Sequence, residues 1–333
     1  MRKIKFQKIN FLFSFTILIF LLIIVSIFSL SKGSVFISNK DIWLAILQRG
    51  DQINQTIIME LRLPRLISSL LVGSSLGMSG SLLQGMLRNG LASPYLLGIS
   101  AGSGLVIVFF ISFGIIQTLI PFAAWIGAIL TTLIVFVLSK DGNKINVERL
   151  VLGGVAISSL FGAIQATLLL QAEDGRIQAA LNWLIGSLNA RGWQEIKFTA
   201  LPILITLFIG LFLYRQLNLL SLGDELSVSL GTSLFRSRCL IGAIATLLAA
   251  CAVSIGGLIG FIGLIVPHFS RLLIGNDYKY ILPFSALIGA LTLSSADLIS
   301  RLGPIEIPVG IVTALLGAPV FMIILYNRQN YKK

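Results

Sequence analysis

The chain has 333 residues, of which 56% are hydrophobic and only 11% are charged, and its formal net charge is +12. A soluble domain has about a quarter charged residues, and one core of this size cannot bury so much apolar side chain. The composition therefore excludes a soluble enzyme domain, a disordered protein and a disulfide-stapled secreted domain. It indicates an integral membrane protein.

The N-terminal segment 1–10 carries four basic residues and precedes an apolar run over 11–30. A secretory signal peptide has a similar order of features. The run is about 20 residues long, enough to cross a bilayer, and lacks a clear small-residue cleavage site. These two properties favour a retained first membrane span.

Ten apolar segments recur along the chain, separated by short polar, Gly-rich or Pro-containing connections. They predict an all-α integral membrane protein, a polytopic bundle of about ten transmembrane helices in a single domain over 1–333. A further segment, 177–186, is too short to span and is expected to be a re-entrant or surface helix on the outside. The predicted spans are 11–30, 66–87, 95–111, 119–138, 150–170, 198–214, 239–255, 260–273, 281–300 and 307–326.

The distribution of charge predicts the orientation of these spans. With ten spans and the basic N-terminus inside, the inner connections hold 16 of the 25 lysines and arginines. This asymmetry is what the positive-inside rule requires. We therefore expect cytoplasmic segments at 1–10 and 327–333, and we interpret the positive charge as topology rather than nucleic-acid binding. The predicted inner connections are 1–10, 88–94, 139–149, 215–238, 271–280 and 327–333.

Arg62 and Arg65 precede the second span, at the outer surface where the positive-inside rule disfavours them. One interpretation is that they reach lipid headgroups. The other is that they pair with carboxylates on an external partner, because guanidinium groups suit bidentate carboxylate pairing. Farther along the same span, Gly73, Gly77 and Gly80 share one helix face and predict close helix packing.

The longest inner connection, about 215–238, contains four leucines at helical spacing: Leu219, Leu222, Leu226 and Leu230. This stripe predicts a short amphipathic helix, with Gly231 as its C-terminal cap. Such a helix lies on the bilayer or docks into a partner. The acidic residues Asp224 and Glu225 disfavour an anionic lipid surface, so we expect partner docking.

Few residues suit metal, cofactor or catalytic chemistry. Cys239 and Cys251 are twelve residues apart in one apolar segment, about 18 Å along a helix, and cannot pair with each other. His268 is the single histidine and cannot build a metal site alone. Asp297 and Arg301 have the favourable i, i+4 order, so a structural ion pair is preferred over a functional role for this acid.

Several motifs resemble those of the permease subunits of bacterial ATP-driven importers for ferric siderophores, haem and cobalamin, the FecCD family. The resemblance covers nearly the whole chain from about residue 60, in blocks that follow one another in the family's order. It implies a type II ABC importer permease in the bacterial cytoplasmic membrane. The blocks include Arg62-Leu-Pro-Arg65, Arg88-Asn-Gly-Leu-Ala-Ser-Pro94, Gly260-Phe-Ile-Gly-Leu-Ile-Val-Pro-His-Phe-Ser-Arg271 and Ile307-Pro-Val-Gly-Ile-Val-Thr-Ala-Leu-Leu-Gly-Ala-Pro319.

The resemblance implies partners and assigns roles by motif. The partners are a second permease chain, identical or different, two cytoplasmic ATPase subunits, an external substrate-binding protein and the lipid bilayer. Arg62, Arg65 and Arg301 would receive acidic residues of the binding protein. The segment with Leu219, Leu222, Asp224, Leu226, Leu230 and Gly231 would couple to the ATPase.

The same resemblance places a cytoplasmic gate at Asn89 and Leu91, with Val147 and Glu148 in a second gate segment. Gly90 stands where the family usually has proline, which loosens the first gate segment. The block around Asn182 and Trp193 is similar to siderophore-type members.

The chain lacks the phosphate-binding motif G-x-x-x-x-G-K-[S/T], so we expect ATP hydrolysis in a partner subunit and no enzyme activity here. The cargo predicted from the resemblance is an iron–siderophore complex, with haem or cobalamin as alternatives. A proton-coupled secondary transporter is the rival from another class, although most acidic residues fall in loops and at helix ends rather than at the bilayer midplane. A membrane-embedded hydrolase has the least support.

Overall fold

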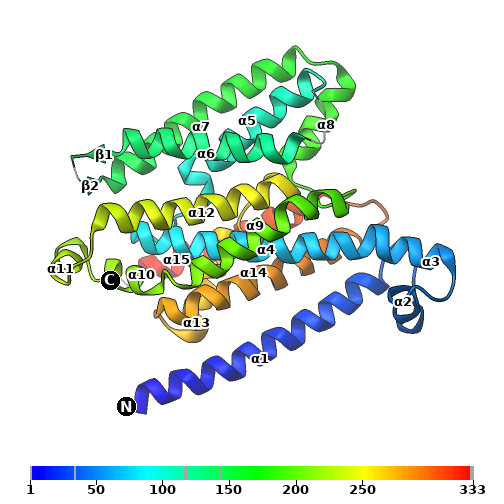
Figure 1. The fold of residues 1–333 in the computed structure, drawn as a ribbon, viewed down its shortest axis with the longest axis horizontal. Helices are drawn as coiled ribbons and strands as arrows, with labels where there is room; N and C mark the ends of the chain where they lie inside the picture. Colours follow the sequence, from blue (N-terminus) through cyan, green and yellow to red (C-terminus); the bar gives the residue numbers. More distant parts are fainter. Residues whose placement is uncertain (1, 34, 116–118, 143, 331–333) are drawn as a thin grey trace.

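The structure is a computed structural model that describes residues 2–33, 35–115, 119–142 and 144–330. Within these residues, long helices run side by side along one axis, and a single short β-hairpin is the only sheet (Figure 1). The two predicted cytoplasmic termini are described only in part, because residues 1 and 331–333 lie outside these ranges.

Ten apolar helices occupy the positions of the ten predicted spans. Among the described residues, seven contain a stretch long and apolar enough to cross a membrane: α1 (Arg2–Ser31), α4 (Leu63–Leu87), α6 (Ile120–Leu138), α7 (Val147–Leu170), α9 (Trp193–Leu211), α12 (Leu234–Gly256) and α14 (Tyr278–Ser300). Three have shorter apolar stretches: α5 (Ile99–Ser112), α13 (Ile262–Ile274) and α15 (Val309–Asn330). The predicted all-α bundle is therefore confirmed for the described residues.

The remaining elements lie at the two ends of the bundle. One end, here called the hairpin end, carries β1 (Lys140–Asp141), β2 (Lys144–Ile145), α10 (Tyr214–Ser221) and α11 (Asp224–Ser229) (Figure 1). The opposite end, here called the α3 end, carries α2 (Asn39–Ile46), α3 (Gln52–Thr56) and α8 (Asp174–Ile185). A π-helix, η1 (Ile57–Arg62), joins α3 to α4, and a 3₁₀ turn, η2 (Pro94–Leu97), precedes α5. The N- and C-terminal helices begin and end at the hairpin end.

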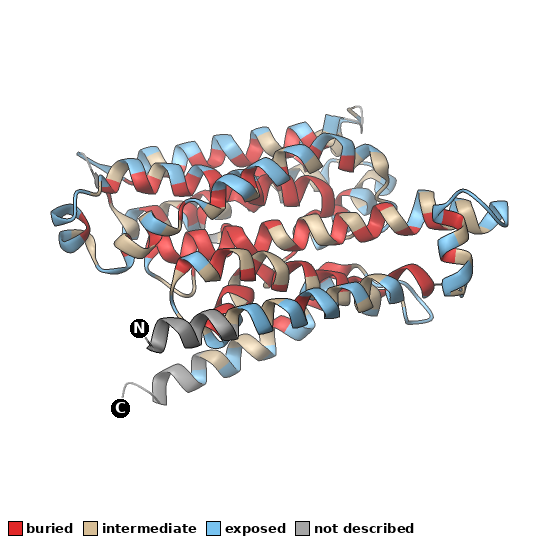
Figure 2. Ribbon diagram, turned by 60° about the horizontal axis from the view of Figure 1, so that its bottom comes forward, coloured by how far each residue is buried: buried red, intermediate tan, exposed pale blue. Residues whose placement is uncertain are grey.

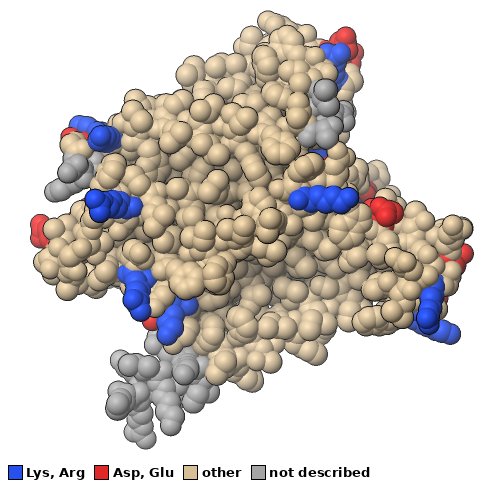
Figure 3. All heavy atoms as spheres, viewed as in Figure 1, with Lys and Arg blue, Asp and Glu red and all other residues tan. Residues whose placement is uncertain are grey.

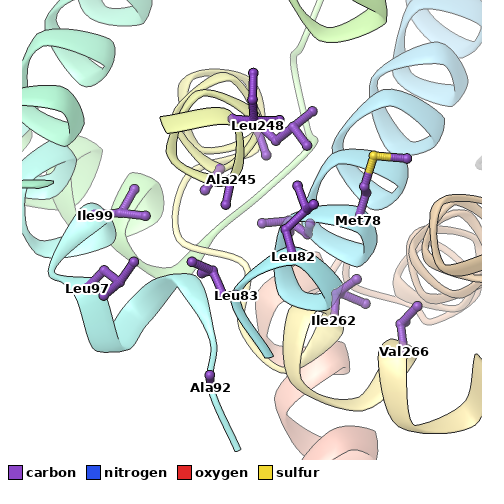
Figure 4. Packing of buried hydrophobic residues seen from close by; sticks show 14 of the residues in the cluster. Met78, Leu82, Leu83, Ala92, Leu97, Ile99, Ala245, Leu248, Ile262 and Val266 are labelled. Carbon is purple, nitrogen blue, oxygen red and sulfur yellow. The ribbon is translucent and has the colours of Figure 1, made fainter. Parts of the chain in front are cut away.

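Helix α4 is the centre of the bundle. It packs most extensively against α14 and α12 and also against α13, and Figure 2 shows buried residues concentrated along these inner helices. Leu82 and Leu83 of α4 meet Leu248 of α12 and Ile262 of α13 in one apolar cluster (Figure 4).

The predicted glycine face of α4 is where its neighbours approach most closely. A Cβ added at Gly73 would lie 2.3 Å from the carbonyl oxygen of Gly289 in α14. One added at Gly80 would lie 1.9 Å from the carbonyl oxygen of Gly263 in α13. Only a hydrogen atom fits these contacts, which lets helix backbones touch where lipid supplies no apolar contrast.

Helix α8 corresponds to the predicted non-spanning segment 177–186. It buries Trp183 and ends inside the bundle, because backbone hydrogen bonds tie the residues that follow it to two other helices. Ser187 N–H donates to the Gly256 carbonyl at the end of α12, and Gly310 N–H in α15 donates to the Gly186 carbonyl, both at 2.9 Å. Its C-terminal end is therefore fixed against the spanning helices.

The leucine stripe of 219–230 does not form the one continuous helix that its spacing predicts. Helices α10 and α11 are separated at Gly223, whose φ of +109° is accessible almost only to glycine. Leu230 is the C-cap residue of α11, one position before the predicted cap, and Gly231 follows it with a φ of +84°. Thus two short helices replace one.

Charged side chains lie mostly toward the two ends of the long axis on the face shown in Figure 3, with a wide uncharged band between them. This band is the surface that the hydrocarbon region of a bilayer requires.

Candidate functional site

A buried carboxylate holds the α3 end together. Asp297, near the end of α14, is fully buried and lies between two guanidinium groups. Arg65 Nε donates to its Oδ1 at 2.9 Å, and Arg301 Nη2 lies 3.0 Å from its Oδ2. The predicted Asp297–Arg301 ion pair is therefore present. Arg65, which sequence reasoning placed on the surface, belongs to the same cluster.

Arg62 has a different set of partners. Its guanidinium donates to the carbonyl oxygens of Leu30 at 2.6 Å and Ser31 at 2.9 Å, and also to that of Val35. These carbonyls lie at and just beyond the C-terminal end of α1, where backbone acceptors lack partners within the helix. Arg62 thus caps α1 from η1. Arg301 also reaches α1, by donating to Ser29 Oγ at 2.5 Å.

The three predicted docking arginines do meet in one place. Arg62, Arg65 and Arg301 line a pocket of about 660 Å³ at the α3 end, here called the arginine pocket. Its acidic lining residues are Glu60 and Glu306, and Glu306 forms an ion pair with Arg65. The side chain of Glu306 is 36% exposed, whereas that of Arg65 is 10% exposed.

The electrostatics of the arginine pocket follow from burial. Burial lowers the pKa of the Arg301 guanidinium, and the adjacent Asp297 carboxylate acts in the opposite direction. The two carboxylates that pair with these arginines differ in exposure, since Asp297 is buried and Glu306 is partly exposed. An incoming carboxylate has to compete with that glutamate.

At the hairpin end, Asp224 at the start of α11 is the carboxylate at the centre of an ion-pair cluster, as Asp297 is at the α3 end. It accepts from Arg238 Nη2 of α12 at 2.9 Å, and Arg88 Nη1 lies 3.8 Å from the same carboxylate. Arg238 also donates to the Ile145 carbonyl of β2 at 3.1 Å. One carboxylate thus connects α11 to α12, to the hairpin and to the segment after α4.

The predicted coupling leucines form an exposed apolar surface on this end. Leu222, Leu226 and Leu230 are each more than half exposed, and Leu219 is half-buried. Ser227 Oγ donates to the Leu219 carbonyl at 2.7 Å, which holds α11 against α10. Although the helix is broken, three of the four leucines remain available to a partner.

Three of the four predicted gate residues, Leu91, Val147 and Glu148, line two neighbouring pockets. Leu91 lines a pocket of about 920 Å³ between α4, α13 and α15, and Asn89 Oδ1 accepts from its N–H at 3.0 Å. Val147 and Glu148 line a second pocket of about 500 Å³, together with Asp224. Arg88 lines both pockets.

Sequence reasoning missed Glu306 and Arg238, the internal partners of two predicted sites. The Arg65–Glu306 contact joins segments far apart in the chain. Arg238 lies only 14 residues from Asp224 in the same predicted connection, and the two meet because the chain turns between α11 and α12. Among the described residues, no three His, Cys, Asp or Glu side chains are grouped so that they could hold a metal ion.

Comparisons with known proteins give one family. The sequence model described as the FecCD transport family matches residues 21–327. The chain is 39% identical to the Fe(3+)-citrate import system permease protein YfmE of Bacillus subtilis, over 98% of each chain. It is 37% identical to the hemin transport system permease protein HmuU of Yersinia pestis, over 94% of this chain and 95% of that one.

A solved structure described as an inward-facing conformation of a metal-chelate type ABC transporter has the same fold. It superposes with a TM-score of 0.85 at 33% identity, covering 93% of this chain and 97% of its own.

The Asp297 cluster predicts a stability effect. Asp297→Asn removes the charge that two buried guanidiniums share, and loss of one partner of a buried pair costs about 3–5 kcal/mol. We expect a clear fall in the thermal unfolding temperature of the detergent-solubilised protein. The control is Asp141→Asn, since Asp141 and its partner Arg149 are both exposed and 3.8 Å apart. Equal unfolding temperatures for Asp297→Asn and the unsubstituted protein would contradict the assignment.

Proposed function

Because the chain belongs to the FecCD transport family, we propose that it is the permease subunit of an ATP-driven importer that carries an iron–siderophore complex across a bacterial cytoplasmic membrane. One observation carries the proposal: the bundle has an arginine-lined pocket at one end and an exposed leucine surface at the other. A binding-protein-dependent importer needs these two surfaces on opposite sides of the membrane.

The hairpin end is proposed to be cytoplasmic. Helix α1 begins and helix α15 ends there, and the basic segment 1–10 and the inner connections rich in lysine and arginine support this orientation. The α3 end then faces outward, toward the binding protein. Both named relatives are bacterial proteins, which supports the bacterial cytoplasmic membrane as the location.

The ATPase subunits are proposed to dock on α10 and α11. Leu222, Leu226 and Leu230 supply the apolar anchors of a helix-in-groove contact. A shift of α11 would move Asp224, and with it Arg88 beside the first gate segment and Arg238 beside the hairpin. This connection supplies a physical route from ATP hydrolysis to the predicted gate residues.

The binding protein is proposed to dock at the α3 end, with its acidic residues reaching Arg62, Arg65 and Arg301. The arginines are already engaged, so docking would be an exchange of partners. Glu306 is the residue best placed to be displaced, because its side chain is partly exposed and pairs with Arg65. In the assembled importer, a second permease chain, identical or different, would complete the pathway for the cargo.

An iron–siderophore complex is the proposed cargo, and the name of the Bacillus subtilis relative supports a ferric chelate. Haem is a second candidate, favoured by the 37% identity to a hemin permease over nearly the full length.

Reconstitution tests the proposed function directly. The chain is placed in liposomes with candidate ATPase and binding-protein subunits, and uptake of radioactive ferric siderophore is measured. We expect uptake only when ATP is supplied. Uptake driven by a proton or sodium gradient without nucleotide would instead support a secondary transporter and contradict the proposal.

If the exposed leucines of α10 and α11 bind the ATPase, loss of ATPase binding and loss of coupling to transport should be separable by substitution. Leu226→Asp places a charge in the apolar contact, and loss of such an anchor costs about 2 kcal/mol or more, so ATPase co-purification should fall about thirtyfold. Asp224→Asn keeps the leucines but removes the ion pairs, so the ATPase should still bind while uptake per ATP hydrolysed falls. Leu226→Met is the control. Normal co-purification and uptake with Leu226→Asp would remove the coupling assignment.

The partner exchange predicts that Glu306→Gln strengthens docking of the binding protein, because it frees Arg65 from a competing carboxylate. The affinity should rise most at low salt, where screening is weakest. Glu60→Gln is the matched control, since it removes an equal charge from the same pocket and Glu60 has no ion pair within the described chain. Unchanged affinity with Glu306→Gln would argue against docking through Arg65. Reversal of Arg65 itself would be a poor test, because it would oppose Asp297.

A further inference from the structure

The segment that carries the docking arginines begins with a π-helical turn, η1. The N–H of Leu63 donates to the carbonyl of Ile58, five residues back, whereas an α-helix would use the carbonyl four residues back. Short π-helical turns within α-helices are rare and occur frequently at functional sites. This turn lies between α3 and α4, and it ends at Arg62.

The π register leaves the carbonyl of Met59 without a donor from its own helix. In the α register this carbonyl would accept from the N–H of Leu63, which is engaged with Ile58. In the π register the donor would come from position 64, but Pro64 has no N–H. An unsatisfied backbone carbonyl away from water is costly. The Met59 carbonyl therefore needs a donor from another part of the chain.

Trp193, the first residue of α9, supplies that donor. Its indole Nε1 donates to the Met59 carbonyl at 2.8 Å, although the two residues are 134 positions apart in the sequence. The indole has a single N–H and accepts no hydrogen bond, so this contact uses its whole capacity. If the contact were lost, the Met59 carbonyl could regain a backbone donor by a return of Leu63 to the α register.

The register of η1 decides which of its side chains face the arginine pocket. Residues 189–192, directly before Trp193, form another part of the pocket wall. The hydrogen bond from Trp193 to Met59 thus joins two parts of that wall. A change to the α register would turn α3 by about 100° relative to α4, the rotation of one helical residue. Four residues of η1 line the pocket: Ile57, Glu60, Leu61 and Arg62.

Two further contacts of η1 depend on the same register. Ile58 is fully buried in an apolar cluster with Leu30 of α1 and Ile42 of α2. On another side of the turn, Arg62 donates to carbonyl oxygens at the end of α1. A rotation of η1 would break both contacts and withdraw the Arg62 guanidinium from its place in the pocket.

We propose that Trp193 is a positioning residue for binding-protein docking, because its N–H holds η1 in the π register that places Arg62 in the arginine pocket beside Arg65. The inference rests on the proposed function, in which these arginines receive acidic residues of the binding protein. It also gives a physical role to Pro64 between the two arginines. Proline removes the backbone donor at position 64 and makes the register depend on Trp193.

Binding-protein docking tests the proposal on the full chain, assembled with candidate ATPase subunits in lipid nanodiscs. Trp193→Phe keeps an aromatic ring and removes only the N–H. We expect it to weaken equilibrium binding of the binding protein about tenfold, the size of one lost hydrogen bond, with the largest effect at low salt. Trp43→Phe is the matched control, since Trp43 is 67% exposed at the same end of the bundle, and it should leave binding unchanged.

A double substitution separates positioning from direct contact with the partner. Pro64→Ala supplies an N–H at position 64, so the Met59 carbonyl obtains a donor from its own helix. In a Pro64→Ala background, Trp193→Phe should therefore change docking by less than about twofold. An equal, tenfold loss in both backgrounds would mean that the indole itself touches the binding protein, and it would overturn the proposal.

The register is also measured without any partner. In a Cys239→Ala, Cys251→Ala background, spin labels are attached to Ile53→Cys in α3 and to Leu302→Cys, both exposed positions. Trp193→Phe should shift the distance between the labels by about 5 Å, the radius of a helix with its side chains. Trp43→Phe should not shift it.

An unchanged label distance in Trp193→Phe would overturn the proposal, whatever happens to docking. Failure of the proposed function has a different signature. No candidate binding protein would then bind the unsubstituted assembly, and no ATP-driven uptake would be seen, while the label distance would still show whether Trp193 sets the register of η1.

Discussion

The buried carboxylate of Asp297 is the constraint on which the α3 end depends. A charge with no exposed surface is tolerated only when close partners replace its lost hydration, and here Arg65 and Arg301 supply them from opposite sides. The same guanidiniums extend the cluster to Glu306 and to α1 through Ser29. Four segments are therefore held in one arrangement by a carboxylate that contacts neither lipid nor water. The arginine pocket has its shape because these contacts fix its walls.

Each end of the bundle is held by one carboxylate that lies beside two arginines. At the α3 end, ion pairs inside the protein leave a pocket lined by donors. At the hairpin end, Asp224 is held by Arg238 and Arg88, and this leaves the leucines of α10 and α11 free to face a partner. Between them, the glycine face of α4 brings α13 and α14 into backbone contact. Under the proposed function, cargo enters at the α3 end, and the ATPase subunits act on the hairpin end.

The spans were predictable because each straight crossing of a bilayer needs about 20 apolar residues, and these residues are consecutive in the sequence. The glycine face and the Asp297–Arg301 pair were predictable for the same reason, since helix periodicity alone brings those residues together. The partner of Asp297 across the bundle was not, because Arg65 lies 232 residues away. The leucine stripe predicted one helix, and the break at Gly223 depends on a positive φ that periodicity does not register.

The orientation of the bundle is the claim that both docking proposals share, and thiol accessibility tests it most directly. In a variant with Cys239→Ala and Cys251→Ala, single cysteines are introduced as Leu302→Cys at the α3 end and Leu230→Cys at the hairpin end, both exposed positions. Intact cells whose outer surface is open to a membrane-impermeant maleimide are then labelled. The account predicts labelling at position 302 in intact cells and at position 230 only after the membrane is permeabilised. Labelling at position 230 but not 302 in intact cells would reverse the orientation and contradict the account.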